Sequence, residues 1–319
     1  MTSAQDASDA FAKVSAPSAG GYDVARLTTT SSFRVGRGPE GSVVLLTPPE
    51  VEDRVGAPTR LRRLTVHARA SVSVEVPGSG SSTETVGLVE LREISDDLLP
   101  AFCGIAAAVA DLIGEDPAPG IVRAALRHVV RLFEPRPGRR GSVLGLWGEL
   151  LTILISADPE AMVESWHVEI DDRFDFAVPG ARLEVKTTAG GRRAHEFNLE
   201  QLRPVDGAEA RLVSVMTTAT SAGSSLSDLV GHLHPRLSGR VDLVMKVWQL
   251  VAETLGDDWM PSTASLRWDR MQAEKSLRLF QMDEVPRVRE DLDPAIESVR
   301  LRVVCEEVRP LDAAIRIPF

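Results

Sequence analysis

The stretch Asp172–Thr188, with the sequence DRFDFAVPGARLEVKTT, decides how the most informative part of this chain folds. Two segments with strand character flank Pro179-Gly180, a dipeptide typical of turns, so a β-hairpin is predicted. If the hairpin is symmetric about that turn, Asp175 lies opposite Glu184, and Lys186 shares the face of Glu184 because side chains alternate along a strand. Pro-Gly is not a preferred two-residue hairpin turn, so we expect a four-residue loop, which leaves this register unchanged.

This register places the Cβ atoms of the two acidic residues about 5 Å apart, where like charges repel. A divalent metal ion would supply the compensating cation, and Lys186 would act on whatever the metal holds. Leu183 and Val185 would pack on the opposite face of the hairpin. The alternative is an exposed hairpin whose acidic side chains are only solvated.

Lys186 is one of only four lysines among the 36 basic residues of the chain. In a chain so biased toward arginine, a lysine on this strand indicates a need for a compact ammonium group. The alternative is an ordinary lysine on the surface of a strand.

The order of these residues resembles the active-site motif of the PD-(D/E)XK nuclease superfamily, which includes most restriction endonucleases. Its elements here are Asp175, eight intervening residues, and then Glu184-Val185-Lys186. Phe174 stands where the written motif has proline, which is a common departure. The resemblance covers about residues 142–217.

Two flanking segments extend the resemblance. Gly145–Leu151 resembles the first-helix segment that contributes an extra acidic ligand, here Glu149. His195–Leu202 resembles the segment after the lysine strand, where family members often carry a polar active-site residue, here Gln201.

The resemblance implies a mixed α/β (α+β) fold, with a restriction-endonuclease-like core in which helices flank a central mixed β-sheet. It also implies a metal-dependent nuclease that hydrolyses DNA phosphodiester bonds. Asp175, Glu184, Glu149 and Val185 would form a site for Mg²⁺, for which Mn²⁺ can substitute. Lys186 would orient the attacking water, and Gln201 would complete the catalytic set.

Three of these residues have a second interpretation. Glu149 lies in an apolar helix, where a carboxylate is costly unless it binds a metal or pairs with an arginine. Gln201 can reach back to Asn198 as part of a helix cap instead of contacting the active site. His195 can contact a phosphate or a metal-bound water, or it can simply be solvated.

Contacts to nucleic acid are expected from polar and basic residues near the motif. The candidates are Thr187, Thr188, Arg192, Arg193, His195, Arg139 and Arg140. Arg123, Arg127 and Arg131 recur at four-residue spacing and form one stripe of a helix, which is either a solvated face or a surface that tracks phosphates.

Composition limits the class of protein. The 319 residues carry a net charge of −10, which argues against a protein that coats nucleic acid through bulk electrostatics. No apolar run approaches the length of a membrane span, and the N-terminus has no apolar signal region, so a cytoplasmic protein without membrane contact is expected. Two cysteines, Cys103 and Cys305, fit a reducing compartment.

The chain is expected to contain five regions. They are a flexible N-terminus (1–30), a β-rich region (31–95), a helical connector (96–140), the nuclease core (141–220) and a C-terminal α/β region (221–319). Helices are predicted over 100–113, 119–133, 143–155 and 241–255, strands over 166–170, 211–216 and 299–308, and a polar linker over 217–227.

The preferred hypothesis is a DNA endonuclease in restriction or anti-phage defence, possible as a homodimer or with other defence subunits. One alternative is a catalytically inactive nuclease-fold module that mediates interactions in a defence complex. Another is a nuclease that acts on RNA or branched DNA, because nothing in the sequence indicates contacts to a base edge or a 2′-hydroxyl.

Overall fold

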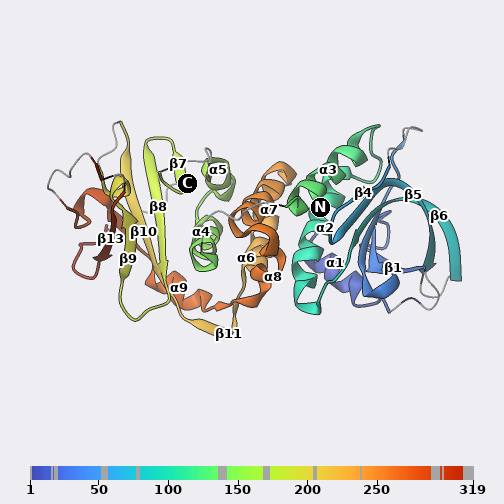
Figure 1. Cartoon of the computed structure of the whole chain (residues 1–319), viewed down its shortest axis with the longest axis horizontal. Coiled ribbons are helices and arrows are strands. Elements are labelled where there is room, and N and C mark those ends of the chain that lie inside the picture. The colour runs from blue at the N-terminus through green and yellow to red at the C-terminus, as the bar shows by residue number, and fades with distance from the viewer. Residues whose placement is uncertain are drawn as a thin grey trace. The chain divides into compact units, whose positions relative to one another are not determined.

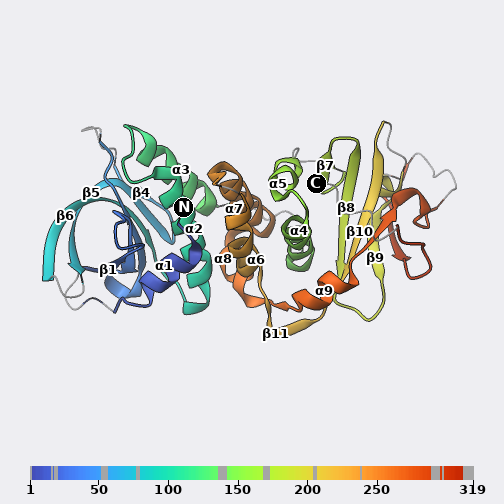
Figure 2. The ribbon, with the colours of Figure 1, turned by 180° about the vertical axis from the view of Figure 1, so that it is seen from behind.

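The computed structural model divides the chain into two compact units (Figure 1 and, from behind, Figure 2). One unit comprises Met1–Arg140 with Leu237–Ser265, and the other comprises Gly141–Arg236 with Leu266–Phe319. The structure describes residues 2–15, 17, 21–51, 57–76, 80–135, 142–167, 173–203, 207–237, 239–288, 295–296 and 298–311. No helix among these residues is long and apolar enough to cross a membrane.

The first unit combines a curved sheet with several helices. Its elements are α1 (Ala4–Phe11), β1 (Tyr22–Arg26), β2 (Arg34–Arg37), β3 (Val43–Thr47), β4 (Thr59–Arg60), β5 (Leu64–Val76), β6 (Gly80–Leu91), α2 (Leu99–Ile113), α3 (Ile121–Phe133), α7 (Val241–Leu255) and α8 (Trp259–Ser265). The sheet order is β1-β2-β3-β6-β5-β4, and β1 also pairs with β5, which closes the sheet on itself. Within 1–30, where a flexible N-terminus was expected, the chain forms α1 and β1.

Helix α3 begins at a buried carboxylate. Glu50 is completely buried and accepts hydrogen bonds from the backbone N–H groups of Gly120 and Arg123, at 2.8 and 3.0 Å. These groups belong to the first turn of the helix, which has no intrahelical acceptors. On the arginine stripe, Arg127 and Arg131 are exposed and Arg123 is half-buried.

The second unit has a mixed sheet between helices and a strand pair. Its elements are α4 (Val143–Ile155), α5 (Pro159–Ser165), β7 (Phe176–Val178), β8 (Ala181–Thr188), β9 (Ala194–Asn198), β10 (Glu209–Met216), β11 (Ala219–Ser224), α6 (Leu226–Leu233), α9 (Arg270–Ser276), β12 (Arg278–Gln281) and β13 (Arg300–Val304). The sheet order is β12-β10-β8-β7, with β8 and β10 parallel and the other pairs antiparallel. Figures 1 and 2 show α4 and α5 on one side of this sheet and the β9–β13 pair on the other. The predicted mixed α/β fold is confirmed.

The β7–β8 hairpin has the predicted register. Phe176 pairs with Leu183, and Val178 pairs with Ala181, so the next residue outward, Asp175, lies opposite Glu184. The expected four-residue loop is wrong, because only Pro179 and Gly180 connect the paired residues. Gly180 has φ of 75°, which glycine adopts without steric cost and which permits the tight turn.

Helix α4 has the predicted bounds and packs very closely on β8. Its N-cap Ser142 accepts a hydrogen bond from the N–H of Gly145. A Cβ atom added at Gly148 would lie 1.7 Å from Oγ1 of Thr187. The absent side chain therefore lets the helix backbone approach the strand, which positions the neighbouring Glu149.

Other expectations for this half of the chain need correction. The polar linker predicted over 217–227 contains β11 and the start of α6, and Ala219 and Ser224 of β11 form isolated bridges with Trp268. The strand predicted over 166–170 is interrupted at once, since His167 has φ of 41°; residues 168–170 lie outside the described residues. The C-terminal region expected as one piece is shared, because 237–265 belongs to the first unit.

Candidate metal centre

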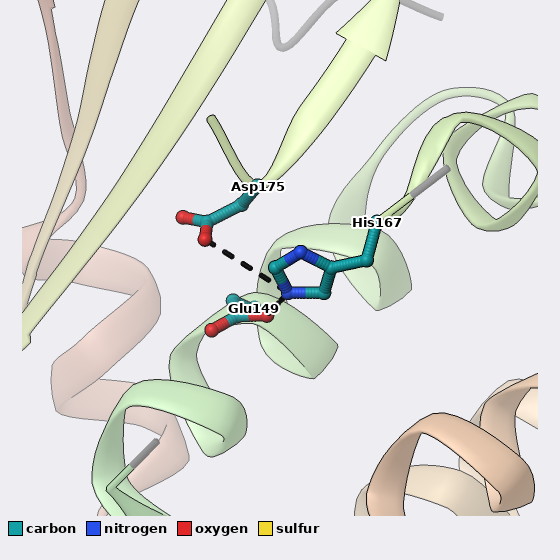
Figure 3. Close-up of side chains that lie close together, drawn as sticks. All are labelled: Glu149, His167 and Asp175. Atoms are coloured by element: carbon teal, nitrogen blue, oxygen red, sulfur yellow. Dashed lines mark hydrogen bonds and ion pairs between the residues drawn. The ribbon is translucent and has the colours of Figure 1, made fainter. Parts of the chain in front are cut away.

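Three side chains from separate elements converge beside the β7–β8 hairpin. Glu149 lies on α4, His167 follows α5, and Asp175 immediately precedes β7 (Figure 3). Nε2 of His167 lies 3.0 Å from Oε2 of Glu149 and 4.0 Å from Oδ1 of Asp175. One potential ligand atom from each residue falls within 4.8 Å of the others, so these three residues can hold a metal ion.

The local backbone explains why His167 points toward Glu149. Trp166 pairs with Phe176 as an isolated antiparallel bridge, and the N–H of His167 donates to the carbonyl of Asp175 at 3.0 Å. Successive residues of a regular strand point to opposite faces, but the left-handed backbone of His167 breaks that alternation. Trp166 Nε1 and His167 Nε2 therefore contact the same Glu149 oxygen, at 2.8 and 3.0 Å.

A second group of side chains surrounds Glu184, which is only 2% exposed. Its Oε1 accepts from Nζ of Lys186 at 2.5 Å and from Nε2 of Gln201 at 2.7 Å. Its Oε2 is buried and has no hydrogen-bond partner in the described part of the chain. Nζ of Lys186 also lies 5.4 Å from the centre of the Phe197 ring.

Gln201 both caps a short helix and contacts Glu184. Its Oε1 accepts from the N–H of Asn198 at 3.1 Å, as a cap of the short helix that follows β9, while its Nε2 donates to Glu184. The cap fixes the side chain, and the fixed side chain orients the carboxylate.

Asp175 links the two groups electrostatically. Its Oδ2 accepts from the N–H of Val185 at 2.7 Å. Burial raises the pKa of Asp175 well above its usual value, and the negative charges of Glu184 and Glu149 raise it further. The contact of Val185 with Asp175 is made by the backbone N–H, on the edge of β8 that faces β7.

The two buried partners on β8 also have shifted pKa values. Burial raises the pKa of Glu184, although the charge of Lys186 and the hydrogen bonds from Lys186 and Gln201 oppose the change. Burial favours neutral Lys186, but the attraction of Glu184, Asp175 and Glu149 outweighs it and raises the pKa of the ammonium group. The lysine therefore stays charged among the carboxylates.

The candidate nucleic-acid residues occupy different environments. Thr187 faces α4, and its hydroxyl is buried, whereas the hydroxyl of Thr188 accepts from the N–H of Gly190 in the turn after β8. Arg192 is exposed, and Arg139 and Arg140 lie outside the described residues.

Arg193 and His195 are buried and bound within the protein. Nη1 of Arg193 donates to the carbonyl and hydroxyl of Ser214, and Nη2 donates to the carbonyl of Ser276. Nε2 of His195 lies 2.6 Å from the same Ser214 hydroxyl. Burial lowers the pKa of His195 to about 4, so its imidazole is neutral at pH 7.

The structure adds two residues that the sequence did not single out as site residues. His167 joins the cluster, and Trp166 donates to Glu149 from a position that is fully buried. The pattern of Trp166–Ile170 predicted a regular strand, and no residue in it signals the left-handed conformation, although histidine adopts it more often than most residues.

The residues present suit a hard divalent cation. Three carboxylates gather around Lys186, and a buried oxygen of Glu184 has no donor within the part of the chain that the structure describes. Carboxylate oxygens are the ligands that Mg²⁺ and Mn²⁺ prefer. A bound cation would relieve the repulsion that raises the pKa of Asp175.

The arrangement defines a mixed α/β protein with a carboxylate-rich centre at a β-hairpin. Over residues 7–305 the chain matches a family model described as "Putative PD-(D/E)XK family member, (DUF4420)". The match spans most of the chain, so this protein belongs to that family and has a nuclease-like fold. No curated protein and no solved structure gives a significant match.

Proposed function

We propose that this protein is a metal-dependent nuclease that hydrolyses DNA phosphodiester bonds. The observation that carries the proposal is the contact of Lys186 with Glu184 at 2.5 Å, beside a buried Glu184 oxygen to which no described residue donates. A strand that carries an acid and a lysine two residues apart, with Asp175 opposite the acid, supports the family's chemistry on these residues.

Glu149, Asp175 and Glu184 would hold the cation, and the edge of β8 at Val185 adjoins them. When bound, the cation would polarise the scissile phosphate and lower the pKa of a coordinated water molecule. The residues of the chain prepare the site for this chemistry: Gln201 orients the Glu184 carboxylate, and Trp166 orients Glu149.

Lys186 has a role of its own. Its ammonium group remains protonated because neighbouring carboxylates raise its pKa. A charged, partly exposed ammonium beside the metal ligands can position the attacking water and stabilise negative charge that develops on the phosphate. Arg192, exposed in the turn after β8, can contact the nucleic-acid backbone.

The test is cleavage of DNA by wild type and Lys186→Ala with Mg²⁺ or Mn²⁺. Plasmid, linear and single-stranded DNA separate endonuclease from exonuclease activity, and RNA and branched DNA test the other substrates. The matched control is Lys275→Ala, because Lys275 is exposed on α9 of the same unit. We expect Lys186→Ala to lose at least about a hundredfold in rate and the control to cleave like wild type.

Equal cleavage by wild type and Lys186→Ala would reject the proposed site. Metal binding without cleavage of any substrate would favour the inactive interaction module. The proposal includes action as an endonuclease in restriction or anti-phage defence, alone, as a homodimer or with defence subunits. Protection of cells from phage by wild type, lost in Lys186→Ala, tests that role.

A further inference from the structure

His167 brings a nitrogen ligand to a centre that otherwise consists of carboxylates. Its Nε2 lies 3.0 Å from a Glu149 oxygen and 4.0 Å from an Asp175 oxygen. Two ligands bound at about 2.1 Å to one ion are at most about 4.2 Å apart. Both distances satisfy that limit, so the imidazole nitrogen can share an ion with either carboxylate.

The surroundings hold the three groups in place. Glu149 receives the indole N–H of the buried Trp166, and Asp175 receives the N–H of Val185. The backbone of His167 is tied to that of Asp175 by a hydrogen bond of 3.0 Å. The three side chains therefore converge on one another (Figure 3). Asp175 turns its Oδ1 toward His167 while its Oδ2 binds Val185, and the Glu149 oxygen that faces His167 is the one that also accepts from Trp166.

Nitrogen in the ligand set changes which ion is favoured. Mg²⁺ binds oxygen ligands and retains its waters, whereas first-row transition-metal ions accept imidazole nitrogen. We propose that His167 is a metal ligand together with Glu149 and Asp175, and that it makes the centre select a transition-metal dication such as Mn²⁺ over Mg²⁺. This inference rests on the metal centre of the proposed function and names the residue that sets its metal preference.

The decisive variant is His167→Asn. Asparagine tolerates the left-handed backbone that position 167 adopts, and it replaces the imidazole nitrogen by an amide oxygen donor. His232→Asn is the matched control, because His232 is exposed on α6 and contacts Arg270 instead of the carboxylates. Thermal unfolding without metal shows whether each variant is folded.

Two measurements test the proposal on the full chain. Calorimetric titration with Mn²⁺ and with Mg²⁺ gives the ratio of the two affinities, and pulsed electron paramagnetic resonance of bound Mn²⁺ detects a directly coordinated imidazole nitrogen. We expect wild type and His232→Asn to prefer Mn²⁺ and to show the nitrogen coupling. In His167→Asn the nitrogen coupling should disappear, and the ratio of the Mn²⁺ affinity to the Mg²⁺ affinity should fall by roughly tenfold or more.

The outcomes separate this inference from the proposed function. If wild type binds Mn²⁺ without a nitrogen coupling, or if His167→Asn keeps both the coupling and the preference, His167 is not a ligand although the metal centre stands. If wild type binds neither ion, the metal centre itself is rejected. A variant that unfolds is replaced by His167→Gln, which again offers an oxygen donor, and the same two readouts decide.

Discussion

Replacing Gly148 by alanine should damage the metal centre although the added methyl group would contact Thr187 instead of a proposed ligand. The added Cβ would lie 1.7 Å from Oγ1 of Thr187 and 2.9 Å from its Cβ. Rotation of the threonine can move the hydroxyl but leaves its Cβ in place. Because ordinary contacts begin near 3.4 Å, α4 and β8 must separate by about 0.5 Å or more.

The magnitude follows from two opposing effects. Overpacking a buried contact costs about 1–3 kcal/mol, while alanine in a helix is favoured over glycine by about 1 kcal/mol. We expect a net loss of roughly 0–2 kcal/mol in the free energy of unfolding. A shift of half an ångström also moves Glu149 relative to β8, which is enough to disturb a site of this kind, so Mn²⁺ affinity should fall roughly tenfold.

Urea unfolding and calorimetric Mn²⁺ titration measure these two effects. Gly231→Ala in α6 is the control, because a Cβ there meets nothing within 4 Å, and it should stabilise the protein by about 0.5–1 kcal/mol. Thr187→Ala removes the hydroxyl and should partly restore Gly148→Ala. If Gly148→Ala is as stabilising as Gly231→Ala and binds Mn²⁺ like wild type, the close packing of α4 on β8 is refuted.

Three further predictions concern charge and burial. His195 is 4% exposed, and its pKa is lowered to about 4 from 6.5. As the pH falls, the unfolded state therefore takes up a proton before the folded state does. The free energy of unfolding should decrease by up to about 3 kcal/mol between about pH 6.5 and pH 4. In urea unfolding at pH 7 and 4.5, His195→Gln should lose less than wild type. Glu50→Ala leaves the partly buried N–H groups of Gly120 and Arg123 without this acceptor and should cost about 2 kcal/mol, while Mn²⁺ titration stays unchanged. Burial raises the pKa of Asp175, so wild type without metal should lose stability as the pH rises above the usual carboxylate range. Asp175→Asn should remove that loss and should be more stable than wild type at pH 8. The same variant should bind no Mn²⁺. If the stability of Asp175→Asn relative to wild type were lower at pH 8 than at pH 5, the expected direction of this pH dependence would be contradicted.

Local signals in the sequence predicted helix α4 and the register of the hairpin. Ser142 caps α4 where expected, and a pairing symmetric about Pro179-Gly180 gave the register of the hairpin. Both features depend on residues close in sequence, such as a cap side chain or a turn dipeptide. The prediction that Glu184 and Lys186 share one face follows from the alternation of side chains along a strand alone.

Features that depend on tertiary packing were not predictable in the same way. His167 adopts a left-handed backbone that its neighbours in sequence do not require, and the short β11 forms by packing of its partners rather than by propensity. The sequence also gave no indication that Arg193 would turn inward to Ser214. In each case the deciding partner is distant along the chain.

Buried polar residues near the hairpin fall into two groups that differ in how their hydrogen bonds and charges are balanced. Arg193 and His195 find neutral partners inside the protein, so they stabilise the packing of β9 and require no ligand. Glu184 keeps an oxygen that finds no donor among the described residues, and burial together with the neighbouring carboxylates raises the pKa of Asp175. Such an arrangement costs folding free energy unless a cation balances it, and strained or unsatisfied residues concentrate at functional sites. The unbalanced group therefore supports the proposed metal centre, and the balanced group beside it packs β9 against the sheet.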